Sequence, residues 1–542
     1  MRLNNTRFGL LSTALLAAFL TNNSSAQPGF ERGDVVTFAD SRLVNSADFS
    51  DREVFFATNG GLWKLNRNSG TMLDPEYQAY GLGKSIPFGS LSHVLFHRQT
   101  ATLWVSGSEG LFMRETGLDH WTPVWGVEDD VQRLGERNDT LFLMRNSKLY
   151  GIAVFGRRDL GWLKDTGAEG IRWSPGNIQK SEINAFPFYH TFDPAFRYDP
   201  DRGRLVDRDL NEFNPVFSLI DPFQSRRYIG YRKLGIGVGD DRRGSIEVFR
   251  TGPAGRVGAI ALGKDGDIFT GGVGDSKRDG ISRFDRRTGN WQPSGRRERW
   301  GGESNQIYDL AFYKESIYAA SDEGLLVGNG SDWSLYGLLE GAPKPPVWLV
   351  EIVGDQLIVG GSSGLRVMHL PKGPFEDLKT PGDAELYAAD GDVDGDSIWL
   401  AGPQGLFYAT IEGGVENMGA GPPFSEMPSR AVVVTAKSVV VGGSYGLYFY
   451  DRKTGDWREM PERAHFNSGQ VIALAARDEA FFVGTDRGLF YYNDATGKVL
   501  PFGFEQGLPN QRVDELTFEA DTLWVGTRAG LTRINLNARY WR

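Results

Sequence analysis

The chain contains no cysteine among its 542 residues, so no disulfide can stabilise it and no N-terminal cysteine can carry a lipid. Histidine is also scarce, with 6 residues, and none of them falls at a repeated position. The motifs of a nucleophilic serine elbow, a phosphate loop or a dinucleotide-binding turn are absent. We therefore expect no catalytic residue, no cofactor and no bound metal.

Long apolar runs are missing too, except near the N-terminus. Two arginines precede an apolar stretch at residues 8–20, and the small residues Ser24-Ser25-Ala26 follow it. This is the order of a secretory signal peptide, and the stretch is too short to span a bilayer. We predict a signal peptide over residues 1–26 and an exported protein, periplasmic, extracellular or on the cell surface, with no membrane span.

Positive charge is not in excess. The formal net charge is −10 at pH 7, and removing the leader with its two arginines makes it −12. Such a balance argues against binding nucleic acid or an anionic membrane through the whole surface. We expect no nucleic-acid partner.

Glycine and tryptophan, by contrast, are abundant, with 70 and 14 residues. An apolar phrase that ends in Gly-Leu or Gly-Ile recurs, and its last seven glycines are separated by 44, 40, 41, 41, 42 and 42 residues. These glycines are Gly280, Gly324, Gly364, Gly405, Gly446, Gly488 and Gly530. A period near 42 residues, filled with short β-prone runs and turns, is typical of a four-stranded propeller blade.

The spacing predicts an all-β fold of tandem β-propellers with about 11–12 four-stranded blades of ~42 residues each. The N-terminal propeller would occupy residues 27–255 with about five blades, and the C-terminal propeller residues 256–542 with seven. An irregular insertion at 162–222 breaks the period and could contain a degenerate blade. In a nested alternative, an early strand at Val35-Val36-Thr37-Phe38 closes the C-terminal ring.

The last repeat contains Gly507-Leu508-Pro509-Asn510, then Leu523-Trp524-Val525-Gly526-Thr527 and Gly530-Leu531. These phrases resemble the two-component-regulator propeller repeat. In that family the propellers are extracytoplasmic sensor parts of hybrid histidine kinases, many of which respond to glycans. Because the sequence ends soon after this repeat, we expect a stand-alone member without a kinase. The layout also resembles, more weakly, the tandem-propeller surface component of the type IX secretion system.

The irregular insertion combines aromatic residues with arginines, which suits stacking on sugars or gripping a partner protein. The candidate ligand- or partner-binding residues are Phe186, Tyr189, Phe192, Phe196, Arg197 and Tyr198. In the alternative interpretation these aromatics cover a propeller face or form the core of a distorted blade.

Alternating carboxylates at Asp390, Asp392 and Asp394 resemble the start of a calcium-binding loop. The twelfth position of such a loop needs a bidentate glutamate, but here it is Ala401. We interpret the segment as a hairpin turn and expect no metal site.

Two functional hypotheses follow. The favoured one is a non-catalytic, sensor-like binding or scaffold protein whose ligand is a glycan or an envelope protein. The alternative is a propeller-fold polysaccharide lyase or lactonase-type hydrolase with its chemistry at a central funnel.

Overall fold

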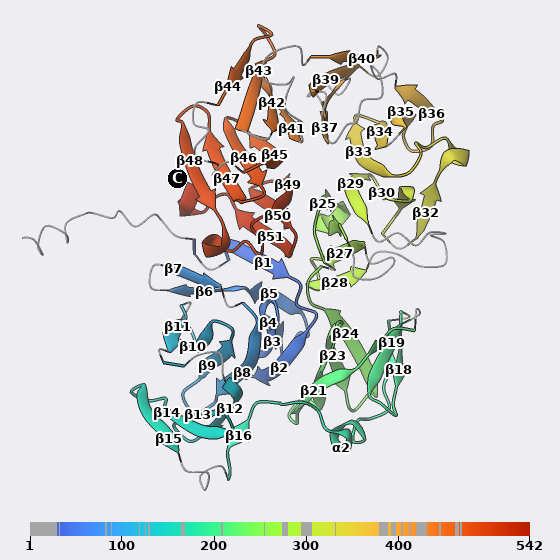
Figure 1. Cartoon of the computed structure of the whole chain (residues 1–542). Helices are drawn as coiled ribbons and strands as arrows, with labels where there is room; N and C mark the ends of the chain where they lie inside the picture. The colour runs from blue at the N-terminus through green and yellow to red at the C-terminus, as the bar shows by residue number, and fades with distance from the viewer. Residues whose placement is uncertain are drawn as a thin grey trace, which may run out of the picture.

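The computed structural model places almost every residue it describes in a short antiparallel strand or a turn, and the strands form two units side by side (Figure 1). It describes residues 30, 31, 33–81, 84–87, 89–118, 120–124, 126–127, 131–163, 169–193, 195–207, 210–253, 255–273, 280–293, 306–330, 332–361, 363–378, 388–391, 397–402, 405–410, 414–418, 431–443, 446–460, 466 and 469–541. The predicted signal peptide lies outside these ranges. Within them, no helix has the length and apolar character that a membrane span requires.

The C-terminal propeller consists of seven four-stranded units whose innermost strands contact one another around a closed ring. The first of these units is joined at its outer edge to the last sheet of the N-terminal propeller through the pair Arg250 and Trp291. Six of the sheets are β25–β28 (Ala259–Leu262, Ile268–Gly271, Ile281–Asp285, Asn290–Pro293), β29–β32 (Ile307–Tyr313, Ser316–Ser321, Gly324–Gly328, Trp333–Tyr336), β33–β36 (Val347–Val353, Gln356–Gly361, Gly364–His369, Phe375–Leu378), β37–β40 (Ala388–Gly391, Ser397–Gly402, Gly405–Thr410, Gly414–Asn417), β41–β44 (Ala431–Val434, Ser438–Gly443, Gly446–Asp451, Trp457–Glu459) and β45–β48 (Val471–Arg477, Ala480–Thr485, Gly488–Asn493, Lys498–Phe502). The seventh joins β49 (Val513–Glu519), β50 (Thr522–Thr527) and β51 (Gly530–Asn535) to the N-terminal strand β1 (Val35–Ala39). Single-turn helices η2 (Lys264–Gly266), η3 (Leu338–Glu340), η6 (Phe504–Gln506) and η7 (Arg539–Trp541) accompany these sheets.

The Gly-Leu phrase opens the third strand of its blade, as the repeat predicts. Gly488 and Gly530 have φ angles of +134° and +142°, a region that side chains other than glycine rarely occupy. The preceding strand ends in a threonine, and the Thr527 hydroxyl donates a 2.9 Å hydrogen bond to the carbonyl of Gly530. The leucine after the glycine is fully buried at Leu489 and Leu531. Turn geometry therefore requires the glycine, and core packing the leucine, at the start of the third strand of the blade.

Strand β1 closes the C-terminal ring by antiparallel pairing with β51, from Val35 opposite Ile534 to Ala39 opposite Gly530 (Figure 1). The first described strand thus belongs to the same sheet as the last, which is the nested arrangement that the sequence leaves open. All five residues of β1 are buried.

The N-terminal propeller lies between β1 and β25 in the sequence and contains four further four-stranded units. They are β2–β5 (Val44–Phe49, Glu53–Thr58, Gly61–Asn66, Met72–Glu76), β8–β11 (Leu91–His97, Thr102–Gly107, Gly110–Glu115, Thr122–Val124), β12–β15 (Val131–Arg137, Thr140–Arg145, Lys148–Ala153, Arg158–Leu163) and β21–β24 (Pro215–Asp221, Arg226–Tyr231, Gly235–Asp240, Ser245–Arg250). A separate hairpin, β6 (Gln78–Gly81) and β7 (Lys84–Pro87), follows the first unit. Together the two propellers contain eleven four-stranded units among the described residues, as the fold prediction expects.

The irregular insertion forms short elements instead of another four-stranded sheet in its described part. These are β16 (Arg172–Trp173), α2 (Lys180–Ile183), β17 (His190–Thr191), and the three-stranded sheet β18–β20 (Phe196–Asp199, Arg204–Asp207, Glu212–Phe213). Strand β16 pairs with the free edge of β12, and β17 pairs in parallel with β24. The Ile178 amide donates to the carbonyl of Val216, so this segment links the β12 sheet to the β21 sheet.

A shared apolar core joins the two propellers. Phe38 of β1 lies 6.3 Å from Trp63 of the N-terminal propeller, 5.7 Å from Trp291 and 6.4 Å from Trp524, measured between ring centroids. All four side chains are buried. The two propellers are therefore packed against each other through aromatic contacts centred on β1.

Candidate functional site

Aspartates interrupt the otherwise apolar innermost strands of both propellers and connect neighbouring blades. Each accepts a hydrogen bond from a backbone amide on a neighbouring innermost strand. The pairs are Phe96 to Asp48 at 2.8 Å, Val350 to Asp309 at 2.9 Å, and Val434 to Asp390 at 2.7 Å. Repeated use of one contact indicates a structural role at the centre of each propeller.

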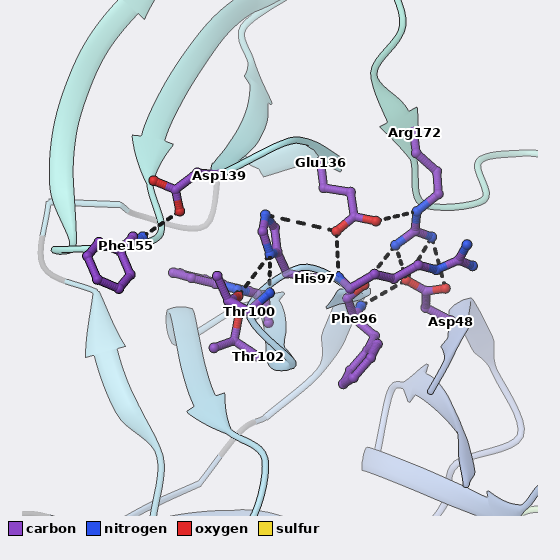
Figure 2. Close-up of polar contacts among 11 residues, drawn as sticks. Asp48, Phe96, His97, Thr100, Thr102, Glu136, Asp139, Phe155 and Arg172 are labelled. Atoms are coloured by element: carbon purple, nitrogen blue, oxygen red, sulfur yellow. Dashed lines mark hydrogen bonds and ion pairs between the residues drawn. The ribbon is translucent and has the colours of Figure 1, made fainter. Parts of the chain in front are cut away.

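In the N-terminal propeller this centre also holds an arginine (Figure 2). Arg172 of β16 contacts Asp48 of β2 at 3.0 Å and Glu136 of β12 at 2.7 Å. The same guanidinium donates a 2.7 Å hydrogen bond to the carbonyl of Phe96 in β8. One side chain from the irregular insertion thus ties together the innermost strands of three blades.

Burial shapes the electrostatics of this network. It raises the pKa of Asp48, whose side chain is 1% exposed, while the Arg172 guanidinium and two backbone amides oppose the rise. Burial lowers the pKa of His97, and the Glu136 carboxylate, 4.0 Å from Nε2, opposes that shift. The His97 Nδ1 lies 2.8 Å from the Thr100 hydroxyl (Figure 2). The ionised side chains are paired with one another, which suits the network to hold blades together.

We expect Arg172→Met to lower the free energy of unfolding by about 3–5 kcal/mol, because it leaves the buried Asp48 carboxylate without its charged partner. Adding Asp48→Asn should recover part of this loss. Arg157→Met is the matched control, since Arg157 pairs with Glu115 on the surface and should cost less than about 1 kcal/mol. Urea unfolding of the three variants tests this, and equal losses for Arg172→Met and Arg157→Met would contradict it.

Two further carboxylates, Glu351 and Glu515, lie with Asp309 and Asp390 on innermost strands of the C-terminal propeller. Burial raises the pKa of Asp309 to about 7, and burial together with the charge of Asp309 raises that of Glu515 to about 8. Burial and then the charges of Asp390 and Asp309 raise the pKa of Glu351 well above its ordinary value. Acidic groups from four blades therefore act on one another near the axis of this propeller.

Among the described residues, no group of three or more histidine, aspartate or glutamate side chains is arranged to hold a metal ion. Asp390 of the proposed hairpin turn lies in β37, whereas residues 392–396 lie outside the described ranges. The interpretation of that segment as a turn therefore stays a prediction.

The six candidate residues of the insertion divide by exposure. Tyr189, Phe196 and Tyr198 are buried and pack between the β18–β20 sheet and the β21–β24 sheet. The Tyr189 hydroxyl donates to Asp241. Phe186 is partly buried, with the Arg227 guanidinium 4.9 Å from its ring centroid. The other two, Phe192 and Arg197, are exposed. The structure thus places three of the six in the core, and a binding role for the set stays a prediction.

Exposed phenylalanines nevertheless gather at one end of the β21–β24 sheet. Phe188, Phe192 and Phe223 are 71%, 75% and 77% exposed, and the exposed arginines Arg242 and Arg243 lie in the turn between β23 and β24. We call these five residues the aromatic patch. Phe223 follows the predicted insertion by one residue, so the sequence pattern gave no reason to include it.

Backbone hydrogen bonds bring the three segments of the aromatic patch together. The Asp241 amide donates to the carbonyl of Ser225 at 2.9 Å, which aligns the β21–β22 turn with the β23–β24 turn. The His190 amide donates to the carbonyl of Gly244 at 2.9 Å, which aligns β17 with the second of these turns. On either side of the two-residue strand β17, Phe188 and Phe192 are exposed, whereas Tyr189 is buried.

Sequence reasoning missed the central networks. A detectable signal was an acidic residue inside an otherwise uncharged innermost strand, as in Val44–Phe49 and Ile307–Tyr313. Arg172 carried no such signal, because β16 has only two residues and belongs to no repeat.

These features define a tandem β-propeller. No family model and no curated protein matches the sequence. The extracellular domain assigned to hybrid two-component system BT3049 of B. thetaiotaomicron is 12% identical, with a TM-score of 0.44, over 91% of this chain and 75% of that chain. The extracellular domain of BT4673 from the same organism is 13% identical, with a TM-score of 0.42, over 94% and 82%.

The computationally designed protein Ika8 is 15% identical, with a TM-score of 0.40, over 59% of this chain and 95% of the designed one. Likenesses of this size do not assign a function. The functional argument therefore rests on the chain's own residues.

Proposed function

We propose that this chain is an exported, non-catalytic binding or scaffold protein that captures an envelope partner through the aromatic patch. The observation that carries the proposal is that three largely exposed phenylalanines and two arginines lie on segments that backbone hydrogen bonds join at one end of the β21–β24 sheet. Large apolar side chains exposed together commonly mark an interaction site, and aromatic residues and arginine are enriched in interfaces. The remaining features support this assignment separately.

Export is supported by the leader-like order of residues 8–26, and a sensor-like role by the resemblance of the last repeat to two-component-regulator propellers. A protein partner suits the patch better than a glycan. Phenylalanine lacks a polar group that could hydrogen-bond a sugar hydroxyl. Its ring contributes most binding free energy when a partner surface removes it from water. The arginines add charge-assisted contacts to acidic groups at the rim.

The test compares the capture of envelope components by the full chain, by one double variant and by one single variant. Phe188→Ser with Phe192→Ser should reduce capture at least tenfold, since aromatic anchors dominate interface energies. Phe155→Ser is the matched control, because Phe155 is 84% exposed but lies in the β14–β15 turn, outside the patch. Its capture should equal that of the unchanged chain.

Normal capture by the double variant would contradict the proposal, because the binding site would then lie outside the patch. The central funnel of a propeller would be the next candidate site, and the hydrolase or lyase alternative would be favoured. Parallel binding to a glycan panel separates the two partner classes. Glycan binding that the double variant loses would keep the patch and replace the protein partner with a sugar.

A further inference from the structure

A cavity of about 280 Å³ lies at the junction of the two propellers. Its charged and polar walls include Asp74 of β5, Arg286 of the turn after β27, Thr522 of β50 and Arg533 of β51, and its apolar lining includes Phe38 and Phe284. The volume is close to the lower end of the roughly 300–1,000 Å³ of small-molecule sites, which often form between domains. The aromatic patch contributes nothing to this cavity.

Among the residues that the structure describes, each of the two arginines of the cavity pairs with one carboxylate. Arg533 contacts Asp74 at 2.7 Å, and Arg286 pairs with Glu519 while its guanidinium lies 5.4 Å from the ring centroid of Trp524. Their side chains are 31% and 36% exposed, respectively. A guanidinium has five N–H donors, so each arginine keeps donors for an additional oxygen ligand.

We propose that this cavity binds a small organic anion, a carboxylate or a phosphate on a partly apolar body, through Arg286 and Arg533. Arginine recognises both anions with two parallel hydrogen bonds, and the Thr522 hydroxyl can donate a further one. The side chains of Phe38, Phe284 and Met72 line the part of the cavity that accommodates the apolar part of the ligand. A purely apolar ligand would leave the guanidinium donors unsatisfied.

Binding there would be linked to the contact between the propellers. Asp74 belongs to the N-terminal propeller, whereas Arg286 and Arg533 belong to the C-terminal one. An anion on Arg533 therefore competes with the carboxylate of Asp74. The ligand and Asp74 then share one guanidinium, so the affinity of the ligand and the strength of that ion pair between the propellers depend on each other.

Calorimetric titration of the full chain tests this inference, with inorganic phosphate, glucuronate and, as the neutral counterpart, glucose. Phosphate or glucuronate should bind and glucose should not. Arg286→Ala and Arg533→Ala should each weaken binding at least tenfold, as expected for loss of a charge-assisted contact. Arg287→Ala is the control, because Arg287 adjoins Arg286 but its side chain is 86% exposed, and it should bind normally.

Asp74→Asn should tighten binding severalfold because it releases Arg533. Arg533→Lys keeps the charge and should bind with intermediate affinity, which separates loss of the site from loss of folding. If phosphate binds and glucuronate does not, the ligand carries a phosphate group. If glucuronate binds and phosphate does not, the ligand carries a carboxylate group. No binding by the unchanged chain, equal weakening by Arg287→Ala, or weaker binding by Asp74→Asn would overturn the inference. None of these outcomes depends on the aromatic patch.

Discussion

A chain that lacks residues 27–39 should fail to form a cooperatively folded C-terminal propeller. The deletion removes β1, the outer strand paired with β51, and with it five buried residues. Burying a large apolar side chain contributes roughly 1.5–3 kcal/mol, so the loss is on the order of 10 kcal/mol. This is comparable with the whole stability of a typical domain, about 5–15 kcal/mol.

A deletion of residues 27–29 is the control, because it leaves both β1 and Phe30, which stacks on Tyr540, in place and should unfold like the full chain. Phe38→Ala should lower the free energy of unfolding of the C-terminal propeller by about 3–5 kcal/mol, a smaller loss than the deletion causes. Near-ultraviolet circular dichroism during thermal unfolding reports the aromatic core around Phe38. If the longer deletion unfolds with the same midpoint as the control, the closure of the ring by β1 is refuted.

Raising the pH from 6.5 to 9 should destabilise the C-terminal propeller by about 3–5 kcal/mol. Asp309, Glu351 and Glu515 have raised pKa values in the folded chain, so the folded state holds more protons than the unfolded state in this range. The stabilising contribution of Asp309 and Glu515 is complete below the unfolded pKa near 4 and is lost as the pH rises through about 7 to 8, and the raised pKa of Glu351 acts in the same direction. One pKa unit corresponds to about 1.4 kcal/mol, and solvent screening reduces the sum.

Urea unfolding followed at pH 6.5, 7.5 and 9 measures this dependence. The double variant Asp309→Asn with Glu515→Gln should flatten the profile and be more stable than the unchanged chain at pH 9. Glu376→Gln, on the exposed face of β36, should leave the profile as it was. A stability that stays constant or rises between pH 6.5 and 9 would show that these carboxyls are ionised without cost.

The blades could be predicted because each repeats the same local requirements. Glycine at a positive φ, a buried leucine after it and a hydroxyl before it recur at sequence positions such as Gly488 and Gly530. Local conformational demands of this kind leave a trace in the sequence even when the side chains between them vary. The first half carries fewer copies of the phrase, and its four-stranded units are β2–β5, β8–β11, β12–β15 and β21–β24.

The candidate site was harder to predict because exposure depends on contacts distant in sequence. Tyr189 and Phe192 are three residues apart in an aromatic-rich segment, but only Tyr189 faces the core, since β17 is held against β24. The central network joins Asp48 to Arg172 across 124 residues. Neither relation follows from composition or from the period of the repeat, because the insertion has no counterpart in other blades.

The pairing of β1 with β51 also sets an order of assembly. In the seventh sheet β1 is synthesised before all four units of the N-terminal propeller, whereas its neighbour β51 is synthesised after them and after the other six units of its own ring. The N-terminal propeller can thus complete its own sheets while the strand Val35–Ala39 is still unpaired. Until Gly530–Asn535 arrives, that apolar strand has an unpaired edge, the kind of edge on which other chains can add.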